Sequence, residues 1–183
     1  MARREKRYAI AIDAKKCVDC KACVVACRAE NDVPVEYSRP WINEDHRGDW
    51  PRLMLAFEPE QCHHCDDPAC VRVCPTGASY QRADGIVAIK QSDCVGCRYC
   101  VIACPYEARF FREDKGVVEK CDLCSARVDR GEVPACVETC PSKVRVFGDL
   151  NEPKGRLAEL LATRQYKIKK AEAGTGPQLY YLL

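Results

Sequence analysis

The chain has 183 residues, a formal net charge of +2 and sixteen cysteines. This length suggests one domain or two small ones, and the near-balance of charge gives no indication of a nucleic-acid partner. Apolar residues make up 47% of the sequence but only about 38% without the cysteines, which is thin for an ordinary apolar core, so we expect bound metal to supply part of the folding free energy.

The N-terminal segment, MARREKRYAIAID, begins with charged residues. Arg3 and Arg4 form a twin-arginine pair, but no hydrophobic stretch follows them, so we interpret the segment as a charged tail rather than a secretory signal. The chain also contains no run of roughly 20 apolar residues, the length that a membrane-spanning helix needs. If the protein works at a membrane, we expect another subunit to tether it.

Short strands are expected between the cysteine groups, and the first of them, Tyr8–Ile12, alternates. The expected strands are 8–12, 52–57, 78–81, 86–89, 108–111, 117–119 and 144–147. The sequence Ala83-Asp84-Gly85 predicts a hairpin turn between two of them. Each C-x3-C-P stretch predicts a short helix that the proline stops.

Three further segments lie outside this pattern. Residues 28–51 contain three prolines and two tryptophans, and they are predicted to be an irregular insertion. Leu157, Leu160 and Leu161 have helical spacing and predict a helix within 152–164. The tail 174–183 has a Gly-Thr-Gly-Pro break followed by apolar residues, so it either covers its own core or contacts a partner.

The cysteines form four groups of four, and every group begins with C-x2-C and ends with C-x3-C. The groups are Cys17, Cys20, Cys23 and Cys27; Cys62, Cys65, Cys70 and Cys74; Cys94, Cys97, Cys100 and Cys104; and Cys121, Cys124, Cys136 and Cys140. Only the gap between the second and third cysteine varies, with two, four, two and eleven intervening residues. This pattern is an internal repeat of a binding unit.

The spacing indicates iron–sulfur clusters. In C-x2-C-x2-C, one tight loop can place three thiolates around a cubane cage, and in the bacterial C-x2-C-x2-C-x3-C-P pattern the fourth cysteine binds the other cluster of a pair. The third group, CVGCRYCVIACP, matches this pattern in full. The first group has Arg28 in place of the proline, and the second and fourth have longer middle loops. We therefore expect four 4Fe-4S clusters.

The alternatives are mixed clusters or zinc in the fourth group, and disulfides. Structural zinc takes paired C-x2-C units separated by a longer loop, which fits the fourth group in isolation. The first and third groups crowd three thiolates into seven residues, which suits zinc poorly. A disulfide scaffold would normally accompany a secretory signal.

Several motifs outside the ligand spacing carry a family resemblance: CHHC, VPACVETCP, CPTGASYQ at 74–81, ACPYEAR at 103–109 and FGDL at 147–150. With these motifs the chain resembles the four-cluster ferredoxin-like electron-transfer subunit of respiratory molybdopterin oxidoreductases, of the polysulfide and thiosulfate reductase type in the dimethyl sulfoxide reductase family. The resemblance covers nearly the whole chain and is specific for the subunit type rather than for the substrate.

The resemblance implies which cysteines share a cluster. Cluster one would take Cys17, Cys20, Cys23 and Cys140; cluster two Cys121, Cys124, Cys136 and Cys27; cluster three Cys94, Cys97, Cys100 and Cys74; and cluster four Cys62, Cys65, Cys70 and Cys104. Some relatives have tryptophan at the position of Cys97 and hold a three-iron cluster there. This chain keeps Cys97, which implies a full cubane.

The expected fold class is α+β, with two ferredoxin-like two-cluster halves related by pseudo-two-fold symmetry. Residues 1–27 plus 121–150 would form the half with clusters one and two, and residues 52–120 the half with clusters three and four. The insertion 28–51 and a C-terminal helix and extended tail, 151–183, complete this division.

No catalytic constellation stands out, so we expect the chain not to be an enzyme by itself. The resemblance implies an electron-transfer subunit that relays single electrons through clusters one to four, between a molybdopterin catalytic subunit and an integral membrane quinone-reactive subunit. Cluster one would face the catalytic subunit and cluster four the membrane subunit. The complex would act on a sulfur compound and lie at the periplasmic face, with the cytoplasmic face as the alternative.

Two other functions stay open at this point. A soluble polyferredoxin would shuttle electrons between diffusing partners, although the apolar tail speaks against it. A structural protein would use its metals only to hold the chain together. A free, monomeric holoprotein would indicate the first, and clusters that cannot be reduced and reoxidised would indicate the second.

Some residues near the cysteines have two readings. Each loaded cubane site adds a charge of about −2, which changes the net charge from +2 to about −6. Nearby cations are therefore either solvated surface charges or groups that tune cluster potentials: Lys21, Arg28, Arg72, Arg98, Arg109 and Lys120. His63 and His64 are expected to pack or to donate a hydrogen bond rather than to bind iron. Aromatic residues are expected to shield the clusters from water: Tyr80, Tyr99 and Tyr106.

Overall fold

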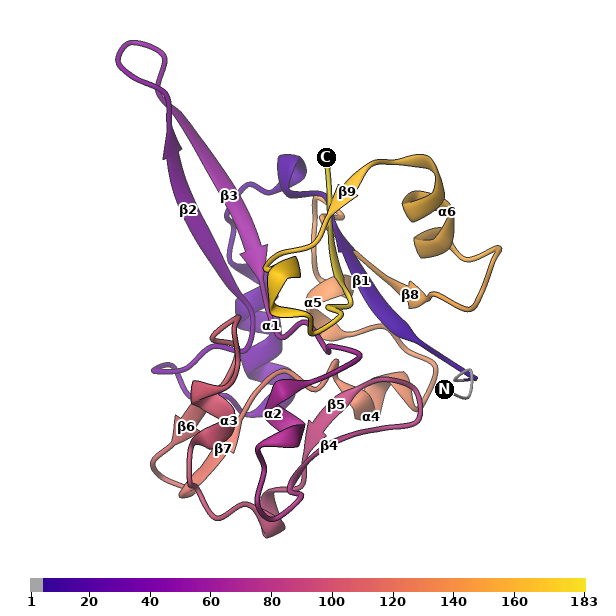
Figure 1. The fold of residues 1–183 in the computed structure, drawn as a ribbon. Helices are drawn as coiled ribbons and strands as arrows, with labels where there is room; N and C mark the ends of the chain where they lie inside the picture. The colour runs from indigo at the N-terminus through magenta and orange to yellow at the C-terminus, as the bar shows by residue number, and fades with distance from the viewer. Residues whose placement is uncertain (1–4) are drawn as a thin grey trace.

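The computed structural model describes residues 5–183, so Arg3 and Arg4 lie outside the described residues. The chain contains both short helices and short strands, several of the strands in consecutive pairs, which confirms the α+β class. In Figure 1, β1 and β8 to β10 occupy the upper part of the molecule with α6, and β4 to β7 occupy the lower part with α2 and α3. No helix in this part of the chain is long and apolar enough to cross a bilayer.

The strands are short, and those that the sequence predicts are found within three residues of the expected bounds. The strands are β1 (Tyr8–Ile12), β2 (Trp41–Arg47), β3 (Met54–Glu60), β4 (Ser79–Gln81), β5 (Val87–Ile89), β6 (Phe110–Arg112), β7 (Val117–Glu119), β8 (Arg145–Asp149), β9 (Tyr166–Lys167) and β10 (Leu179–Leu182). The helices are α1 (Ala22–Asn31), α2 (Ala69–Arg72), α3 (Tyr99–Ile102), α4 (Ser125–Val128), α5 (Ala135–Glu138) and α6 (Arg156–Thr163). Three 3-10 turns complete the set: η1 (Ala14–Lys16), η2 (Gln91–Asp93) and η3 (Ala171–Ala173).

Strand β1 lies inside a four-stranded sheet of order β8-β1-β10-β9. It runs antiparallel to β8 and parallel to β10, and β10 runs antiparallel to β9. Because successive strand residues point to opposite faces, Ile10 and Ile12 enter the main core while Ala9 and Ala11 pack against α6. The sheet thus separates a core that contains cysteines from one that contains none.

The helices next to the cysteines differ in length for a clear reason. Helices α2, α3 and α5 precede Cys-Pro pairs and are four residues long, as the C-x3-C-P pattern predicts. Helix α1 runs for ten residues, from Ala22 to Asn31. Arg28 stands where the other groups have proline, and it keeps the backbone N–H that a helix interior requires. The departure at Arg28 therefore lengthens the helix.

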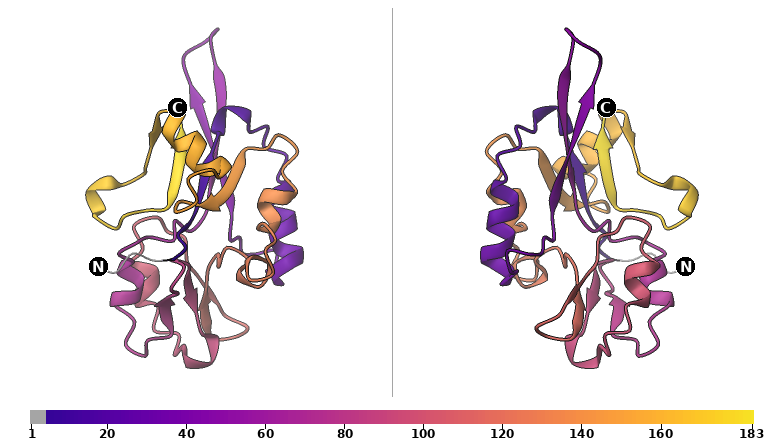
Figure 2. Two further views of the ribbon diagram at one scale, coloured as in Figure 1. Left: turned by 90° about the vertical axis from the view of Figure 1, so that its right-hand side faces the viewer. Right: turned by 90° about the vertical axis from the view of Figure 1, so that its left-hand side faces the viewer.

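The prediction that residues 28–51 form an irregular insertion is wrong. Residues 41–47 form β2, which pairs with β3 from Trp41↔Glu60 to Arg47↔Met54. The resulting hairpin projects from the rest of the molecule (Figures 1 and 2). The last five residues of β2 are exposed, so no alternation of apolar and polar residues marks the strand in the sequence. Its hydrogen bonds to β3 define it instead.

The C-terminal tail covers the chain's own core. Leu179 and Tyr181 in β10 are almost completely buried, and β10 pairs with β1. The backbone N–H of Gln178 donates to the carbonyl of His63, and Lys169 forms salt bridges with carboxylates of β3. Of the two alternatives for the tail, the structure supports burial against the chain's own core.

Candidate iron–sulfur cluster sites

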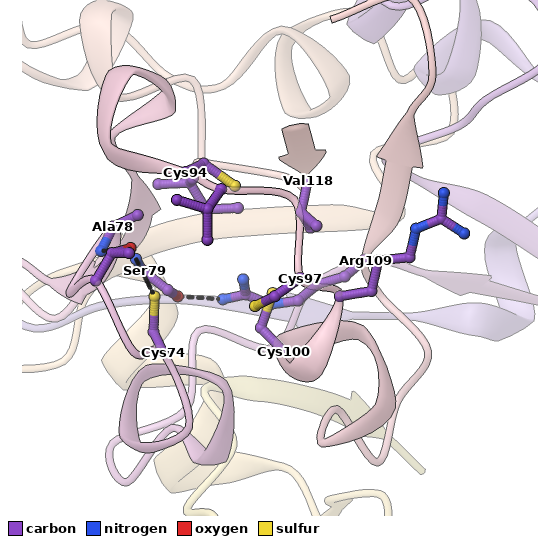
Figure 3. Close-up of a pocket in the computed structure, with 12 residues that line it drawn as sticks. Cys74, Ala78, Ser79, Cys94, Cys97, Cys100, Arg109 and Val118 are labelled. Atoms are coloured by element: carbon purple, nitrogen blue, oxygen red, sulfur yellow. Dashed lines mark hydrogen bonds between the residues drawn. The ribbon is translucent and has the colours of Figure 1, made fainter. Parts of the chain in front are cut away.

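All sixteen cysteines lie within the described residues and are free thiols, so the disulfide alternative is contradicted. Twelve of them line three cavities, four in each. The sets are Cys17, Cys20, Cys23 and Cys140; Cys74, Cys94, Cys97 and Cys100 (Figure 3); and Cys62, Cys65, Cys70 and Cys104. Each set joins three cysteines of one group to the last cysteine of another group.

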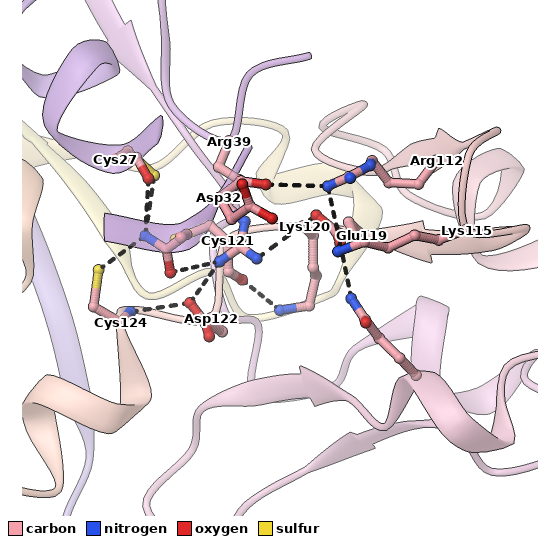
Figure 4. Close-up of polar contacts among 12 residues, drawn as sticks. Cys27, Asp32, Arg39, Arg112, Lys115, Glu119, Lys120, Cys121, Asp122 and Cys124 are labelled. Atoms are coloured by element: carbon pink, nitrogen blue, oxygen red, sulfur yellow. Dashed lines mark hydrogen bonds and ion pairs between the residues drawn. The ribbon is translucent and has the colours of Figure 1, made fainter. Parts of the chain in front are cut away.

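The remaining four cysteines also come together. Asn31 Nδ2 lies 3.6 Å from the Sγ atoms of both Cys27 and Cys124 (Figure 4). Cys136 lies near both Cys27 and Cys121, close enough to raise the pKa of each thiol. This set has the same composition as the others, with three cysteines from the fourth group and the last cysteine of the first.

The loops reach these positions through sharp local turns. Lys21 and Arg98 each follow the second cysteine of a C-x2-C pair, and both adopt left-handed backbone conformations, with φ of 57° and 62°. Each is the N-cap of a helix that contains the third cysteine. Non-glycine residues rarely adopt this conformation, so its recurrence at equivalent positions marks a shared loop geometry that turns three thiols inward.

The cysteine sets fit a cage rather than one ion. Among residues 5–183, no group of three or more His, Cys, Asp or Glu side chains converges closely enough to hold a single metal ion. Zinc requires ligand sulfurs about 2.3 Å from one centre, whereas a cubane presents four iron atoms at separate corners. The donor set is all sulfur, as a cubane requires. Cys140, which a zinc site made from the fourth group would need, lines the cavity of Cys17, Cys20 and Cys23 instead.

Burial opposes the thiolate form of these side chains. It raises the pKa of Cys27 to about 12 and of Cys136 to about 11, and it raises the pKa of Cys121 well above its usual value. Without a cationic centre these thiols are neutral near pH 7. Binding a metal centre requires thiolates and releases their protons. These buried cysteines therefore become anionic ligands only when the positively charged core of a cluster binds to them.

Cys74 differs from these thiols because its sulfur accepts hydrogen bonds. The backbone N–H of Ser79 lies 3.3 Å from its Sγ (Figure 3), and the hydroxyl of Thr76 lies 3.7 Å away. Burial acts in the opposite direction, but these bonds lower the pKa of Cys74 on balance. The short loop after Cys74-Pro75 thus stabilises the thiolate directly.

The two histidines of the CHHC motif are buried and pack as expected from the sequence. His63 stacks on Tyr106, with ring centroids 3.7 Å apart, and borders the cavity of Cys62 and Cys65. Burial lowers the pKa of His63 to about 4, so its imidazole is neutral near pH 7. His64 Nδ1 accepts a hydrogen bond from the backbone of Val87 at 3.1 Å.

The tyrosines and cations near the cysteines differ in their exposure and in their contacts. Tyr106 is buried, whereas Tyr80 and Tyr99 are exposed. Lys21 forms a salt bridge with the half-buried Asp19, and Arg72 forms an exposed one with Asp67. The other cations sort as follows: Arg28 donates to the carbonyls of Val35 and Tyr37, Arg98 lies over Phe111, and Arg109 and Lys120 are buried.

Sequence reasoning missed two residues close to the sulfurs, Asn31 and Arg145. Arg145 is buried and borders the cavity of Cys17, Cys20, Cys23 and Cys140. The sequence spacing could have identified Arg145. It is the fifth residue after Cys140, and Arg109 is likewise the fifth residue after Cys104. No sequence pattern marks Asn31, because its contact with the sulfurs of Cys27 and Cys124 depends on the length of α1.

Comparison with known proteins decides the family. Two family models, both described as a 4Fe-4S dicluster domain, match residues 53–150 and 16–79. The chain is a member of the 4Fe-4S dicluster family. This dicluster chain is 42% identical to the B subunit of tetrathionate reductase from Salmonella typhimurium, over 96% of its own length and 72% of the relative's.

Other relatives agree. The dicluster chain is 38% identical to the B subunit of polysulfide reductase from Wolinella succinogenes, with 96% and 93% of the two chains covered. It is 41% identical to protein NrfC of Escherichia coli, with 95% and 79% covered. These matches and the sixteen cysteines confirm the predicted family and cofactors: the dicluster chain is an electron-transfer subunit with four 4Fe-4S clusters. It is not an enzyme by itself, and the polyferredoxin alternative is not favoured.

Proposed function

We propose that this chain relays single electrons between a molybdopterin catalytic subunit and an integral membrane quinone-reactive subunit, and that the four cysteine sets are the ligands of clusters one to four. The observation that carries the proposal is that two sets, from different pairs, reach the surface. Cys20 of cluster one and Cys97 of cluster three are exposed. Because electron tunnelling weakens steeply with distance, a relay between two partners needs one exposed cluster for each.

The order of the relay follows from the other two clusters. Cys121 of cluster two and Cys62 of cluster four are both buried and lie in the same core cluster. The cavity of cluster four is also bordered by Thr175 of the C-terminal segment. These contacts support the order one, two, four, three. We therefore propose this order in place of the order one to four that the resemblance implies, and we propose cluster three rather than cluster four as the contact with the membrane subunit.

The names of the relatives support the class of complex. The tetrathionate and polysulfide reductase subunits indicate a multi-subunit reductase that acts on a sulfur compound. We propose the same class for this chain, with membrane association through a partner at the periplasmic face. Protease added to spheroplasts should then degrade the chain. If the chain is instead protected in spheroplasts and degraded in inverted membrane vesicles, it lies at the cytoplasmic face.

We also propose that residues 1–27 plus 121–150 and residues 52–120 form two halves related by pseudo-two-fold symmetry. The equivalent backbone turns at Lys21 and Arg98 support this relation.

The surface beside each exposed cluster offers a matched test of the partners. Val18 and Val95 occupy the same place in their C-x2-C loops, border the cavities of clusters one and three, and are 63% and 66% exposed. Exposed apolar side chains of this kind are typical of interface centres. We expect Val18→Glu to lose the catalytic subunit in co-purification but to keep the membrane subunit, and Val95→Glu to do the reverse.

Val35→Glu is the control for this test. Val35 is 75% exposed and borders none of the three cavities, so both partners should remain bound. The proposal is wrong if the Val18 and Val95 variants both keep both partners, or if their losses are exchanged.

A further inference from the structure

Two buried arginines occupy equivalent places in the chain. Arg109 is the fifth residue after Cys104, Arg145 is the fifth after Cys140, and both of these cysteines precede a proline. Their exposed fractions are 5% and 2%. Arginine keeps its charge in proteins, so each position buries a permanent cation.

Neither arginine has a carboxylate partner among residues 5–183. Arg109 Nη2 donates to Cys70 Sγ and to Ser79 Oγ, each at 2.8 Å. Arg145 donates to the side-chain oxygen of Gln61 and to the carbonyl of Glu60. A buried charge is costly unless an opposite charge compensates it. Among these hydrogen-bond partners, only the sulfur of Cys70, beside Arg109, can become an anion, and the partners of Arg145 are neutral.

Each arginine lies between the two clusters of one pair. Arg109 borders both the cavity of Cys94, Cys97, Cys100 and Cys74 and the cavity of Cys62, Cys65, Cys70 and Cys104. Its Nε and Nη1 atoms are buried and have no hydrogen-bond partner among the described residues, 5–183. Arg145 borders the cavity of cluster one and interacts electrostatically with Cys136 and Cys121 of cluster two.

A third buried cation lies between the pairs. Lys120 is 3% exposed, and its Nζ donates to the carbonyl of Cys121 (Figure 4) and to that of Val87. It interacts electrostatically with Cys70 of cluster four. One buried cation therefore stands at each of the three gaps along the order one, two, four, three.

We propose that Arg109 and Arg145 are positioning residues that hold a fixed positive charge between the two clusters of each pair and raise the midpoint potentials of both. The inference rests on the cluster assignment proposed above. Each cluster accepts one electron and gains one negative charge, no bond forms or breaks, and the arginine keeps its protons. A cation between two such sites stabilises the reduced form of each. Its attraction for each reduced cluster partly offsets the repulsion between neighbouring reduced clusters, which is itself unchanged.

Redox titration of the isolated holoprotein, followed by EPR, tests this inference without any partner subunit. We expect Arg109→Gln to lower the potentials of two clusters and Arg145→Gln to lower those of the other two. Arg109→Lys and Arg145→Lys keep the charge and should retain potentials near the wild-type values. Iron analysis of every variant establishes that all clusters are present.

Matched controls separate burial from charge. Arg72→Gln removes an exposed cation two residues from Cys70 and from Cys74, and Lys143→Gln removes an exposed cation two residues from Arg145. Both should leave all four potentials unchanged. Shifts in these controls as large as those in the buried variants would overturn the proposal.

The remaining outcomes are also decisive. Full iron content with unchanged potentials in the glutamine variants would contradict the inference. If the glutamine variants lose clusters, the lysine variants provide the test. Full iron content and wild-type potentials in the lysine variants would support the role of charge. Lost clusters or lowered potentials in the lysine variants would overturn it. Since partner binding is measured with Val18 and Val95, failure of the proposed docking would leave this result unaffected.

Discussion

Asn31 Nδ2 lies 3.6 Å from the sulfur of Cys124, a residue 93 positions later in the chain. The same amide nitrogen lies 3.6 Å from Cys27 Sγ. Arg39 Nη1 donates to Asn31 Oδ1 at 2.9 Å, which orients the amide so that its NH2 group faces the sulfurs. Asn31 thus bridges two ligands of cluster two that come from different cysteine groups.

Removing this amide should lower the potential of cluster two. Hydrogen bonds to the sulfurs stabilise the more negative, reduced form of a cluster, and Asn31→Leu removes the donor while keeping the volume of the side chain similar. We expect one of the four clusters to shift to lower potential in an EPR-monitored redox titration. Asn43→Leu, at an exposed position in β2, is the control and should shift none. An unchanged set of four potentials in Asn31→Leu would rule out this role.

The loop of cluster three tests how closely the chain must pack around a site. Gly96 has φ of +67°, and a Cβ there would lie 2.6 Å from the carbonyl oxygen of Gly116. Gly116 has the same φ, but a Cβ at that position would meet nothing within 4 Å. Both alanine variants carry similar backbone strain, of about 1 kcal/mol, and only Gly96→Ala adds a clash.

We expect Gly96→Ala to lose iron from cluster three, and Gly116→Ala to keep it. Iron and sulfide analysis with EPR of the reduced protein measures this difference. Equal iron content in the two variants would show that the loop can shift without losing its ligand geometry.

Cys97 tests the assignment of a full cubane to cluster three. A serine at this exposed position offers an oxygen where iron in these clusters takes sulfur, so we expect Cys97→Ser to lose one iron and to convert the site into a three-iron cluster. The three-iron form is paramagnetic when oxidised, so a new EPR signal should appear before any reductant is added. A variant with full iron content and no such signal would exclude Cys97 as a necessary ligand.

Removing iron should unfold the molecule unevenly. The main core includes Cys62, Cys121 and Cys140, whereas the second core, which includes Leu157 and Leu160, contains no cysteine. Because metal binding contributes directly to folding in such sites, anaerobic chelation should remove amide hydrogen-exchange protection from the cysteine loops first. Protection in β1, β8 and α6 should persist longest, and simultaneous loss everywhere would contradict this difference.

The sequence by itself determined the cofactor and most of the local structure. The C-x2-C spacing constrains three thiols within a few residues of each other, so the ligand groups and the short helices before Cys-Pro could be predicted without knowledge of the fold. The Ala83-Asp84-Gly85 turn and the alternation in β1 are equally local, and these elements lie where they were expected.

Only the tertiary structure decided how distant segments meet. Strand β2 exists because β3 pairs with it, and the tail is buried because β1 offers it an edge. The exposure of Cys97, the burial of Cys62 and the place of Arg145 beside Cys23 likewise depend on packing between segments far apart in the chain. Cysteine spacing restricts geometry over only a few residues, whereas the order of the clusters and the charges between them depend on contacts that no local pattern encodes.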